Sequence, residues 1–436
     1  MKSIILIIYC LCLTNSANAQ IKIDSFEKIK EILISRSFTL KNTEIQIERA
    51  KKEKISAIIG IIEPIGNSIF SFTNNTQIPV TLVPSEVMGG QPGMFQEVKF
   101  GSQYVTNLNT SLEIKLINLK GWENVRLGNL NIKVTESDNK ITFRNLLETT
   151  AVAYFNIINL QEQLKAFRLN LLSADTLFSY TQNKFNNGLA NIQDMNDSKA
   201  NKLNIEESIR QLEFHISQQI NELKLLCDIP DNESIEINQS IDEEKFEETP
   251  EILNNTLIFD NALEKANYAE SAYDIVKYSN YPTLSLFAAY QKQQFNTQAI
   301  VFDKNVNWST SSYFGVKISF PLPGAESLKQ IMTAKYNHLI AENFANQMKI
   351  KSNLDNKQLL LEFEKAKSQL KNNLTIYSLR KNSYQKNLIN YKEGVIGLEQ
   401  TINSFNLMVN SQYSYLTSIL DLKLVIEKIK INNKIN

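Results

Sequence analysis

Two stretches of the sequence carry the same seven-residue repeat of apolar and aromatic side chains, and each is followed by a glycine. The two sets are Ile157, Leu164, Leu171, Phe178 and Phe185, and Phe363, Leu370, Tyr377, Tyr384 and Tyr391. Gly188 follows the first set by three residues, and Gly394 follows the second by three. A sustained repeat of seven winds helices into a left-handed coiled coil. The shared register indicates an internal duplication.

The predicted helices are long. Those before the two glycines cover about 122–187 and 325–393, which is about 100 Å each at 1.5 Å per residue. Those after the glycines, at about 191–227 and 398–431, reach about half as far. We expect each glycine to take the left-handed conformation that ends a helix, so that the chain reverses there.

Shorter helices precede the extended segments of each half, at about 24–62 and 251–280. Within the long helix of the first half, Gly128 and the Ser-Asp-Asn run at 137–139 weaken the helical pattern. The first turns of that helix are therefore the least secure part of the helical prediction.

Four segments are predicted to be β-strands, at about 65–76, 102–118, 283–295 and 312–320. In 102–118 apolar and polar residues alternate, which gives a strand one apolar and one polar face. A connection rich in proline and glycine, at 79–93, follows the first strand.

These strands are too few to close a barrel in a membrane, because bilayer barrels begin at about eight strands. Three copies would supply twelve. An apolar outer face and a polar inner face would then meet lipid and water. Aromatic residues near the predicted strand ends would form an interfacial girdle: Trp122, Tyr281, Tyr290, Phe295, Trp308 and Tyr313. A soluble antiparallel sheet that covers helices shows the same alternation, so the periodicity alone leaves both interpretations open.

The N-terminus has the pattern of an export signal. Lys2 precedes an apolar core at 4–13, and Ala17-Asn18-Ala19 forms a cleavage site. We therefore predict a signal peptide at 1–19, a first helix–strand–strand–helix repeat at 20–240, an acidic linker at 241–250 and a second repeat at 251–436. Two of the cysteines would leave with the signal, so Cys227 would remain alone, as a small core residue without a disulfide.

In this order and duplication, the chain resembles the TolC-like outer membrane efflux proteins. Four short motifs carry the resemblance: Tyr-Pro-Thr-Leu at 281–284, Phe-Pro-Leu-Pro-Gly at 320–324, Phe-Asn-Asn-Gly at 185–188 and Tyr-Lys-Glu-Gly at 391–394. The resemblance implies a mainly α fold with a small β part, in which a trimer joins a long α-helical coiled-coil barrel to a 12-stranded transmembrane β-barrel. It places the barrel in the outer membrane of a Gram-negative bacterium and the helices in the periplasm.

The resemblance also implies a function and partners. The chain would be the exit duct of a tripartite efflux or secretion system, with a periplasmic adaptor protein and an inner-membrane pump of the RND or ABC type. It would conduct small molecules or polypeptides to the outside. An alternative is a periplasmic adaptor or a surface coiled-coil protein, although adaptors place one helical hairpin between β-rich domains, whereas this chain has two long hairpins.

The helix tips are the candidate gate by this resemblance. Gly188 and Gly394 mark the tips, and Gln193-Asp194 matches a polar pair ahead of the returning helix. Asp194 would accept a hydrogen bond from Tyr391 as a latch that holds the tips closed. Asp194 also suits the first turn of a helix, where it would act only as a cap, and both roles remain open.

Three positions depart from the family pattern. Gln400 and Asn403 stand where well-known members carry two aspartates, and Ile396 replaces a basic residue of the tip. Glu399 is adjacent to Gln400, but a shift of one residue along a helix rotates the side chain by about 100°. The constriction would then be polar and neutral, and cation blockage weak.

Charge and composition favour no other class. The 46 basic and 46 acidic side chains cancel, which argues against a nucleic-acid partner. The sequence has no phosphate-binding glycine loop and only two histidines, so we predict no enzyme activity, no cofactor and no metal.

Overall fold

The computed structural model describes residues 21–238, 251 and 253–435. The predicted signal peptide (1–19) and the acidic linker (241–250) lie outside the described residues. The chain forms two compact units that do not coincide with the two repeats, because each repeat contributes to both units. One unit comprises residues 47–135 and 262–345, and the other comprises the described residues of 21–46, 136–261 and 346–435.

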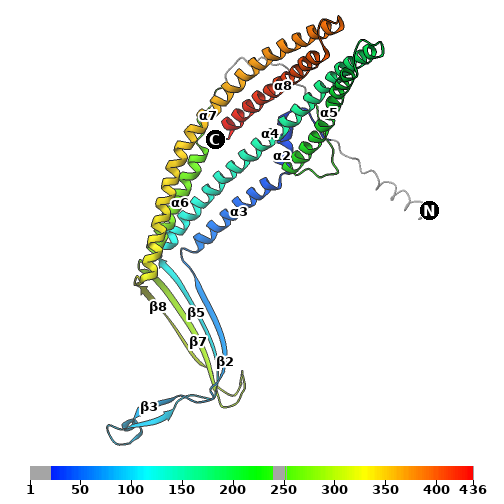
Figure 1. Ribbon diagram of the computed structural model, residues 1–436. Helices are drawn as coiled ribbons and strands as arrows, with labels where there is room; N and C mark the ends of the chain where they lie inside the picture. Colours follow the sequence, from blue (N-terminus) through cyan, green and yellow to red (C-terminus); the bar gives the residue numbers. More distant parts are fainter. Residues whose placement is uncertain (1–20, 239–250, 252, 436) are drawn as a thin grey trace, which may run out of the picture. The chain divides into compact units, whose positions relative to one another are not determined.

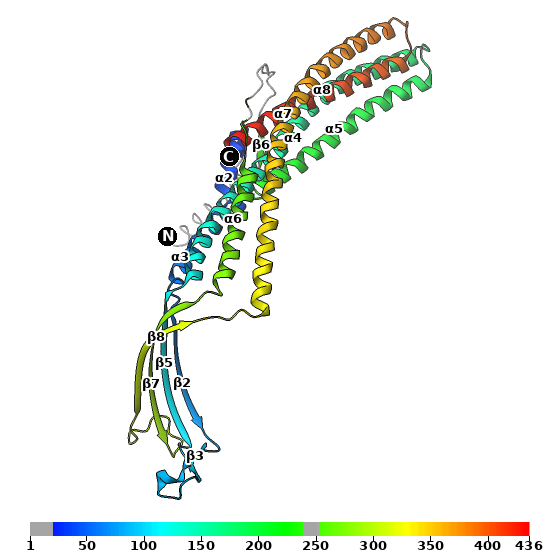
Figure 2. The ribbon, with the colours of Figure 1, turned by 90° about the vertical axis from the view of Figure 1, so that its left-hand side faces the viewer.

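The first unit contains a four-stranded antiparallel sheet (Figures 1 and 2). Its strands, in spatial order, are β2 (Ile65–Asn74), β5 (Tyr104–Ile117), β7 (Thr283–Asn296) and β8 (Ser309–Ser319). All four strand predictions are confirmed, with β8 beginning three residues earlier than expected. The central pair β5–β7 joins the first half of the sequence to the second, and β2 and β8 are the edges.

The register sorts the side chains of the sheet onto two faces. One face is mainly apolar and includes Leu108, Leu112, Ile114, Leu286, Phe314 and Val316. The opposite face is mainly polar and includes Asn107, Asn109, Ser111, Gln291, Gln293 and Ser311. Two charges on this face pair with each other, since Lys317 lies 3.0 Å from the carboxylate of Glu113. The predicted two-faced alternation is therefore present across four strands.

The helices of the two halves match in length. The longest are α4 (Leu119–Asn186) and α7 (Ala325–Lys392), with 68 residues each. The returning helices are α5 (Ile192–Leu226), with 35 residues, and α8 (Leu398–Lys434), with 37. The helices before the strands are α3 (Phe38–Ile59) and α6 (Leu257–Tyr278), with 22 residues each. Within the part of the chain that the structure describes, no helix is long and apolar enough to cross a membrane.

The helix predicted over 24–62 is wrong as a single element. It is divided into α2 (Phe26–Arg36) and α3 by Ser37, whose ψ of 120° is not helical. The backbone N–H of Phe38 donates to the Asp228 carboxylate at 2.8 Å. A free N–H at a helix start needs such an acceptor, so a residue 190 positions away stabilises the break.

Five further elements of the described residues were not predicted. β1 (Ile21–Ile23) and β6 (Ile235–Ile237) form a parallel pair. A hairpin begins in the connection rich in proline and glycine and extends beyond it, with strands β3 (Val80–Pro84) and β4 (Phe95–Lys99). A short 3-10 helix, η1 (Ser85–Met88), lies between these strands.

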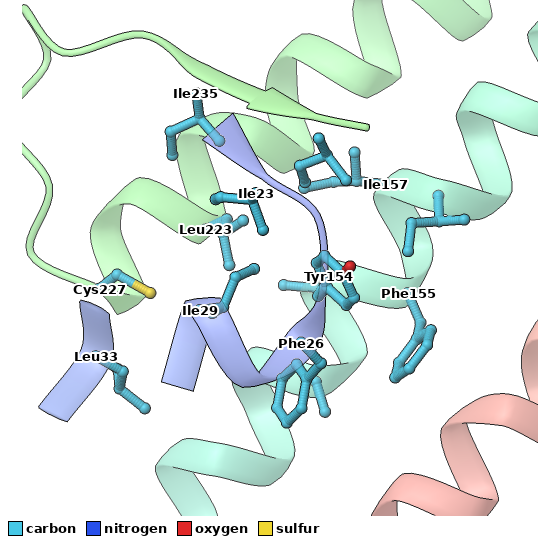
Figure 3. Packing of buried hydrophobic residues seen from close by; sticks show 14 of the residues in the cluster. Ile23, Phe26, Ile29, Leu33, Tyr154, Phe155, Ile157, Leu223, Cys227 and Ile235 are labelled. Carbon is cyan, nitrogen blue, oxygen red and sulfur yellow. The ribbon is translucent and has the colours of Figure 1, made fainter. Parts of the chain in front are cut away.

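The largest buried cluster lies in the second unit, where β1, α2, α4 and α5 meet (Figure 3). Phe26 packs against the ring of Tyr154 at 5.8 Å and that of Phe155 at 6.2 Å. Cys227 is 1% exposed in the same cluster, and its sulfur points toward α2 in Figure 3. Burial raises the pKa of its thiol to about 12. This agrees with the predicted role of a small core residue.

Candidate functional site at the helix tips

The two tips are built by the same backbone motif. At the end of α4, Gly188 donates to the carbonyl of Phe185 at 2.9 Å and Leu189 to that of Lys184 at 2.8 Å. At the end of α7, Gly394 and Val395 make the matching bonds, at 3.1 and 2.8 Å. These are Schellman motifs, which satisfy the last carbonyls of a helix.

The motif requires a left-handed residue at the glycine. Gly188 has φ 73° and Gly394 has φ 79°. Other L-residues reach this region only at a cost. The expectation that each glycine ends its helix in the left-handed conformation is therefore confirmed.

Four residues link the end of α4 to the end of α7, and we call them the α4–α7 clasp: Tyr180, Thr181, Lys184 and Tyr391. The Tyr180 hydroxyl donates to the carbonyl of Lys392 at 2.7 Å. The Tyr391 hydroxyl lies 3.0 Å from that of Thr181. The ammonium of Lys184 donates to the carbonyl of Tyr391 at 2.8 Å.

Aromatic contacts reinforce the clasp. The Lys184 ammonium lies 4.3 Å from the ring centroid of Tyr391 and 5.1 Å from that of Tyr180. The two rings meet edge to face at 5.8 Å. Cation–π and edge-to-face contacts are each favourable by about 0.5–1.5 kcal/mol. Burial raises the pKa of the Tyr391 hydroxyl, so this hydroxyl keeps its proton and can act as a donor throughout the neutral range.

Asp194 is placed as a helix cap. Its backbone N–H donates to the side chain of Asn191 at 2.7 Å, and its carboxylate accepts from the Asn191 backbone at 3.3 Å. This reciprocal pair is a capping box. Its neighbour Gln193 donates to Asp197 at 2.9 Å along the exposed side of α5.

The latch between Asp194 and Tyr391 is not formed in this structure. The Tyr391 hydroxyl pairs with Thr181, and the Asp194 carboxylate pairs with Asn191. Of the two roles left open by the sequence, the geometry of this conformation matches the cap. The heptad identified Tyr391 as a core position, but nothing in the sequence singled out Thr181 or Lys184.

The second tip continues into α8 after Gly397. Gln400 and Asn403 are both exposed, and so is Glu399. On the opposite side of α8, Leu398 and Phe405 are buried. Ile396 packs against the buried cluster of Leu177, Tyr391 and Leu398, so at this position an apolar contact replaces the charge expected from the family pattern.

No protein-family model and no curated protein matches the sequence, whereas solved structures match the fold. The Campylobacter jejuni CmeC outer membrane channel superposes with a TM-score of 0.74 at 16% identity, over 93% of this chain and 85% of that chain. The chain has the fold of TolC-like outer membrane channels. Two more structures of this fold match the chain with similar TM-scores. The Vibrio cholerae outer membrane protein VceC has a TM-score of 0.71 at 15% identity, over 93% of this chain and 95% of that chain.

The open state of the Neisseria gonorrhoeae MtrE outer membrane channel has a TM-score of 0.67 at 14% identity, over 93% of this chain and 88% of that chain. The structural similarity thus covers most of this chain and most of each matched chain. The TolC-like fold that the motifs predicted is confirmed, including its long helices and its small sheet.

Proposed function

We propose that this chain is the exit duct of a tripartite efflux or secretion system in the outer membrane of a Gram-negative bacterium. The observation that carries the proposal is the open sheet. Its edge strands β2 and β8, of 10 and 11 residues, have no sheet partner on their outer sides within the described residues. Long unpaired edges invite pairing with another chain.

The direction of the strands allows identical copies to complete the sheet. Each neighbouring pair from β2 to β8 is antiparallel, so β2 and β8 run in opposite directions. The β8 of one copy can therefore pair in antiparallel fashion with the β2 of the next. Three copies give twelve strands, an even number within the range of outer-membrane barrels.

The two faces of the sheet suit such a barrel. The apolar face, with Leu112, Leu286 and Phe314, would contact lipid. The polar face, with Asn109, Gln291 and Ser311, would line a water-filled interior. A closed barrel satisfies every backbone group, which an open sheet in lipid cannot.

The paired helices of the two repeats (20–240 and 251–436) supply the periplasmic part of the duct. Each 68-residue helix spans about 100 Å. The tips would contact a periplasmic adaptor and receive cargo from an inner-membrane pump of the RND or ABC type. A signal peptide at 1–19 would direct export, and the acidic segment 241–250 would link the repeats.

The gate of this duct is proposed at the helix tips, around Gly188, Gln193, Asp194, Tyr391 and Gly394. The α4–α7 clasp would hold the tips together in the closed state. The exposed amides of Gln400 and Asn403 would form a polar constriction without charge, with little preference for cations.

Conductance of the purified mature protein in planar bilayers tests the proposal. The expected result is discrete pores of uniform size that divalent cations block only weakly. Replacing both amides by aspartate, Gln400→Asp with Asn403→Asp, should make the pores cation-selective and sensitive to divalent cations. A mature protein that never forms pores would exclude the duct and leave the alternative of a periplasmic or surface coiled-coil protein.

A further inference from the structure

Lys292 carries the only charge on the apolar face of the sheet among the described residues. The register pairs Lys292 with Leu108 on β5 and with Thr310 on β8. The other charged side chains of the four strands, Glu113, Lys115 and Lys317, lie on the opposite face. A lone ammonium on a lipid-facing surface is costly unless it meets an anion or water.

The ammonium of this lysine makes a cation–π contact with an aromatic ring. The Lys292 ammonium lies 5.3 Å from the ring centroid of Trp308. Trp308 contacts the ring of Phe302 at 6.0 Å, and Phe302 stacks on Phe70 of β2 at 5.6 Å. Within the described residues, no carboxylate lies within 4.0 Å of the Lys292 ammonium. A cation–π contact uses none of the three hydrogen-bond donors of an ammonium, so these donors can bind an outside acceptor.

The position along the strand matches the border of a membrane. Lys292 lies eight positions after Leu284, which is at the helix end of the sheet, and this is about 26 Å along the strand. Strand tilt reduces this to a height of about 20 Å, and the lipid-facing band of an outer-membrane barrel is about 25 Å tall. A lysine at this level can extend its ammonium to the headgroups.

On β7 beyond Lys292, the residues of the same face, Gln294 and Asn296, are polar and bond to the loop between β7 and β8. Gln294 donates to the carbonyls of Asp303 and Val306, at 2.5 and 2.7 Å. Thr106 donates to the carbonyl of Val301 at 2.8 Å. The ammonium thus lies at the boundary between an exposed apolar band and a hydrogen-bonded polar end.

We propose that Lys292 and Trp308 bind the phosphate-bearing headgroup of an outer-leaflet lipid, with Phe70 and Phe302 against its acyl chains. This inference rests on the proposed function, because it requires the sheet to be in the outer membrane with its loop end outside. The unpaired cation selects an anionic headgroup, and the aromatic residues are typical of the membrane interface.

Tryptophan fluorescence tests the site in the intact trimer. The chain has two tryptophans, Trp122 and Trp308, so a Trp122→Phe background leaves Trp308 as the reporter. Detergent-solubilised trimer is titrated with lipopolysaccharide, with phosphatidylcholine and with inorganic phosphate alone. We expect saturable change of Trp308 emission only with lipopolysaccharide, about fivefold weaker in Lys292→Gln and retained in Lys292→Arg.

Lys304→Gln is the matched control, because Lys304 is an exposed lysine of the same loop and should leave the titration unchanged. Equal affinity of Lys292→Gln and the parent would overturn the lipid site while the trimer and its pores remain. A response to inorganic phosphate alone would overturn the lipid as ligand. Failure to form a trimer would overturn the proposed function itself, and the lipid site with it.

Discussion

The hydroxyl of Tyr391 donates a hydrogen bond to the hydroxyl of Thr181, at 3.0 Å in the buried contact between α7 and α4. The direction follows from Thr181, which already donates its own proton to the carbonyl of Leu177 at 2.9 Å. This bond joins the first repeat to the second at the point where both long helices end.

Removal of that hydroxyl should loosen the tips. Tyr391→Phe deletes one buried hydrogen bond, which costs about 0.5–1.5 kcal/mol, and should raise the open probability of the pores in planar bilayers. Tyr384→Phe is the matched control. The Tyr384 hydroxyl is buried without a hydrogen-bond partner in the described part of the chain, so its loss should leave gating unchanged. Equal gating in both variants would exclude the clasp as a restraint.

Lys184 should help to keep the tips closed through its charge as well as through its hydrogen bond. Lys184→Gln loses the cation–π contacts with two tyrosines, and Lys184→Arg keeps them, so the glutamine variant should open more readily than the arginine variant. Single-channel recording compares the two. Lys199→Gln, on the exposed side of α5, serves as control. An arginine variant that opens as readily as the glutamine variant would argue against a role for the charge.

Replacement of Gly188 or Gly394 by alanine should destabilise the protein because of the backbone conformation alone. A Cβ at Gly188 or Gly394 meets no atom within 4 Å, so alanine would cause no clash. It would still cost about 1–2 kcal/mol at a positive φ. Gly324→Ala, also in open space but without a positive φ, avoids this backbone strain and should cost less. Thermal unfolding measures the difference, and equal stability of all three variants would refute the backbone argument.

The cap and the latch make different predictions for Asp194. As part of the capping box, Asp194→Ala should destabilise α5 by about 0.5–2 kcal/mol, as should Asn191→Ala, and the double variant should cost less than the sum. The effects of Asp194→Ala and Tyr391→Phe should add within about 0.5 kcal/mol. Strong coupling between Asp194 and Tyr391 would instead support the latch in another state.

Stability should fall at alkaline pH. Cys227 has a folded-state pKa of about 12, raised by burial from an ordinary value of 9.0. The folded state therefore holds this proton where the unfolded state releases it. The contribution of Cys227 to the free energy of unfolding is complete below pH 9 and is lost as the pH rises toward 12. Cys227→Ala should flatten this decline in a series of thermal unfolding curves. Rapid labelling of Cys227 by a thiol reagent at pH 8 in the folded protein would contradict its burial.

Strong periodicity made most of the fold predictable. The sequence placed each strand of the sheet within about three residues, with a clear period of two at 102–118. Period seven identified the long helices, and Gly188 and Gly394 identified their ends. The doubt about the start of α4 was misplaced for a physical reason. Gly128 admits the backbone of α3, since a Cβ there would lie 3.2 Å from the Cα of Lys54. Polar residues in this part of α4 bond to other helices, as where Asn139 donates to the carbonyl of Thr43 at 2.8 Å.

The rest depended on contacts distant in sequence. The β1–β6 pair has three residues on each side and joins segments more than 200 positions apart, so no local pattern reveals it. The break before α3 depends on Asp228, and the clasp depends on Thr181 and Lys184. Each of these residues is ordinary in its local sequence and acquires its role from a partner on another helix.

The number of chains in the purified protein tests the central claim most directly. The mass of the protein component in detergent, measured by sedimentation equilibrium, should equal three mature chains and should fall to one after heating. A monomer that stays soluble without detergent would contradict the account, because its sheet would then need no sister copies to close it.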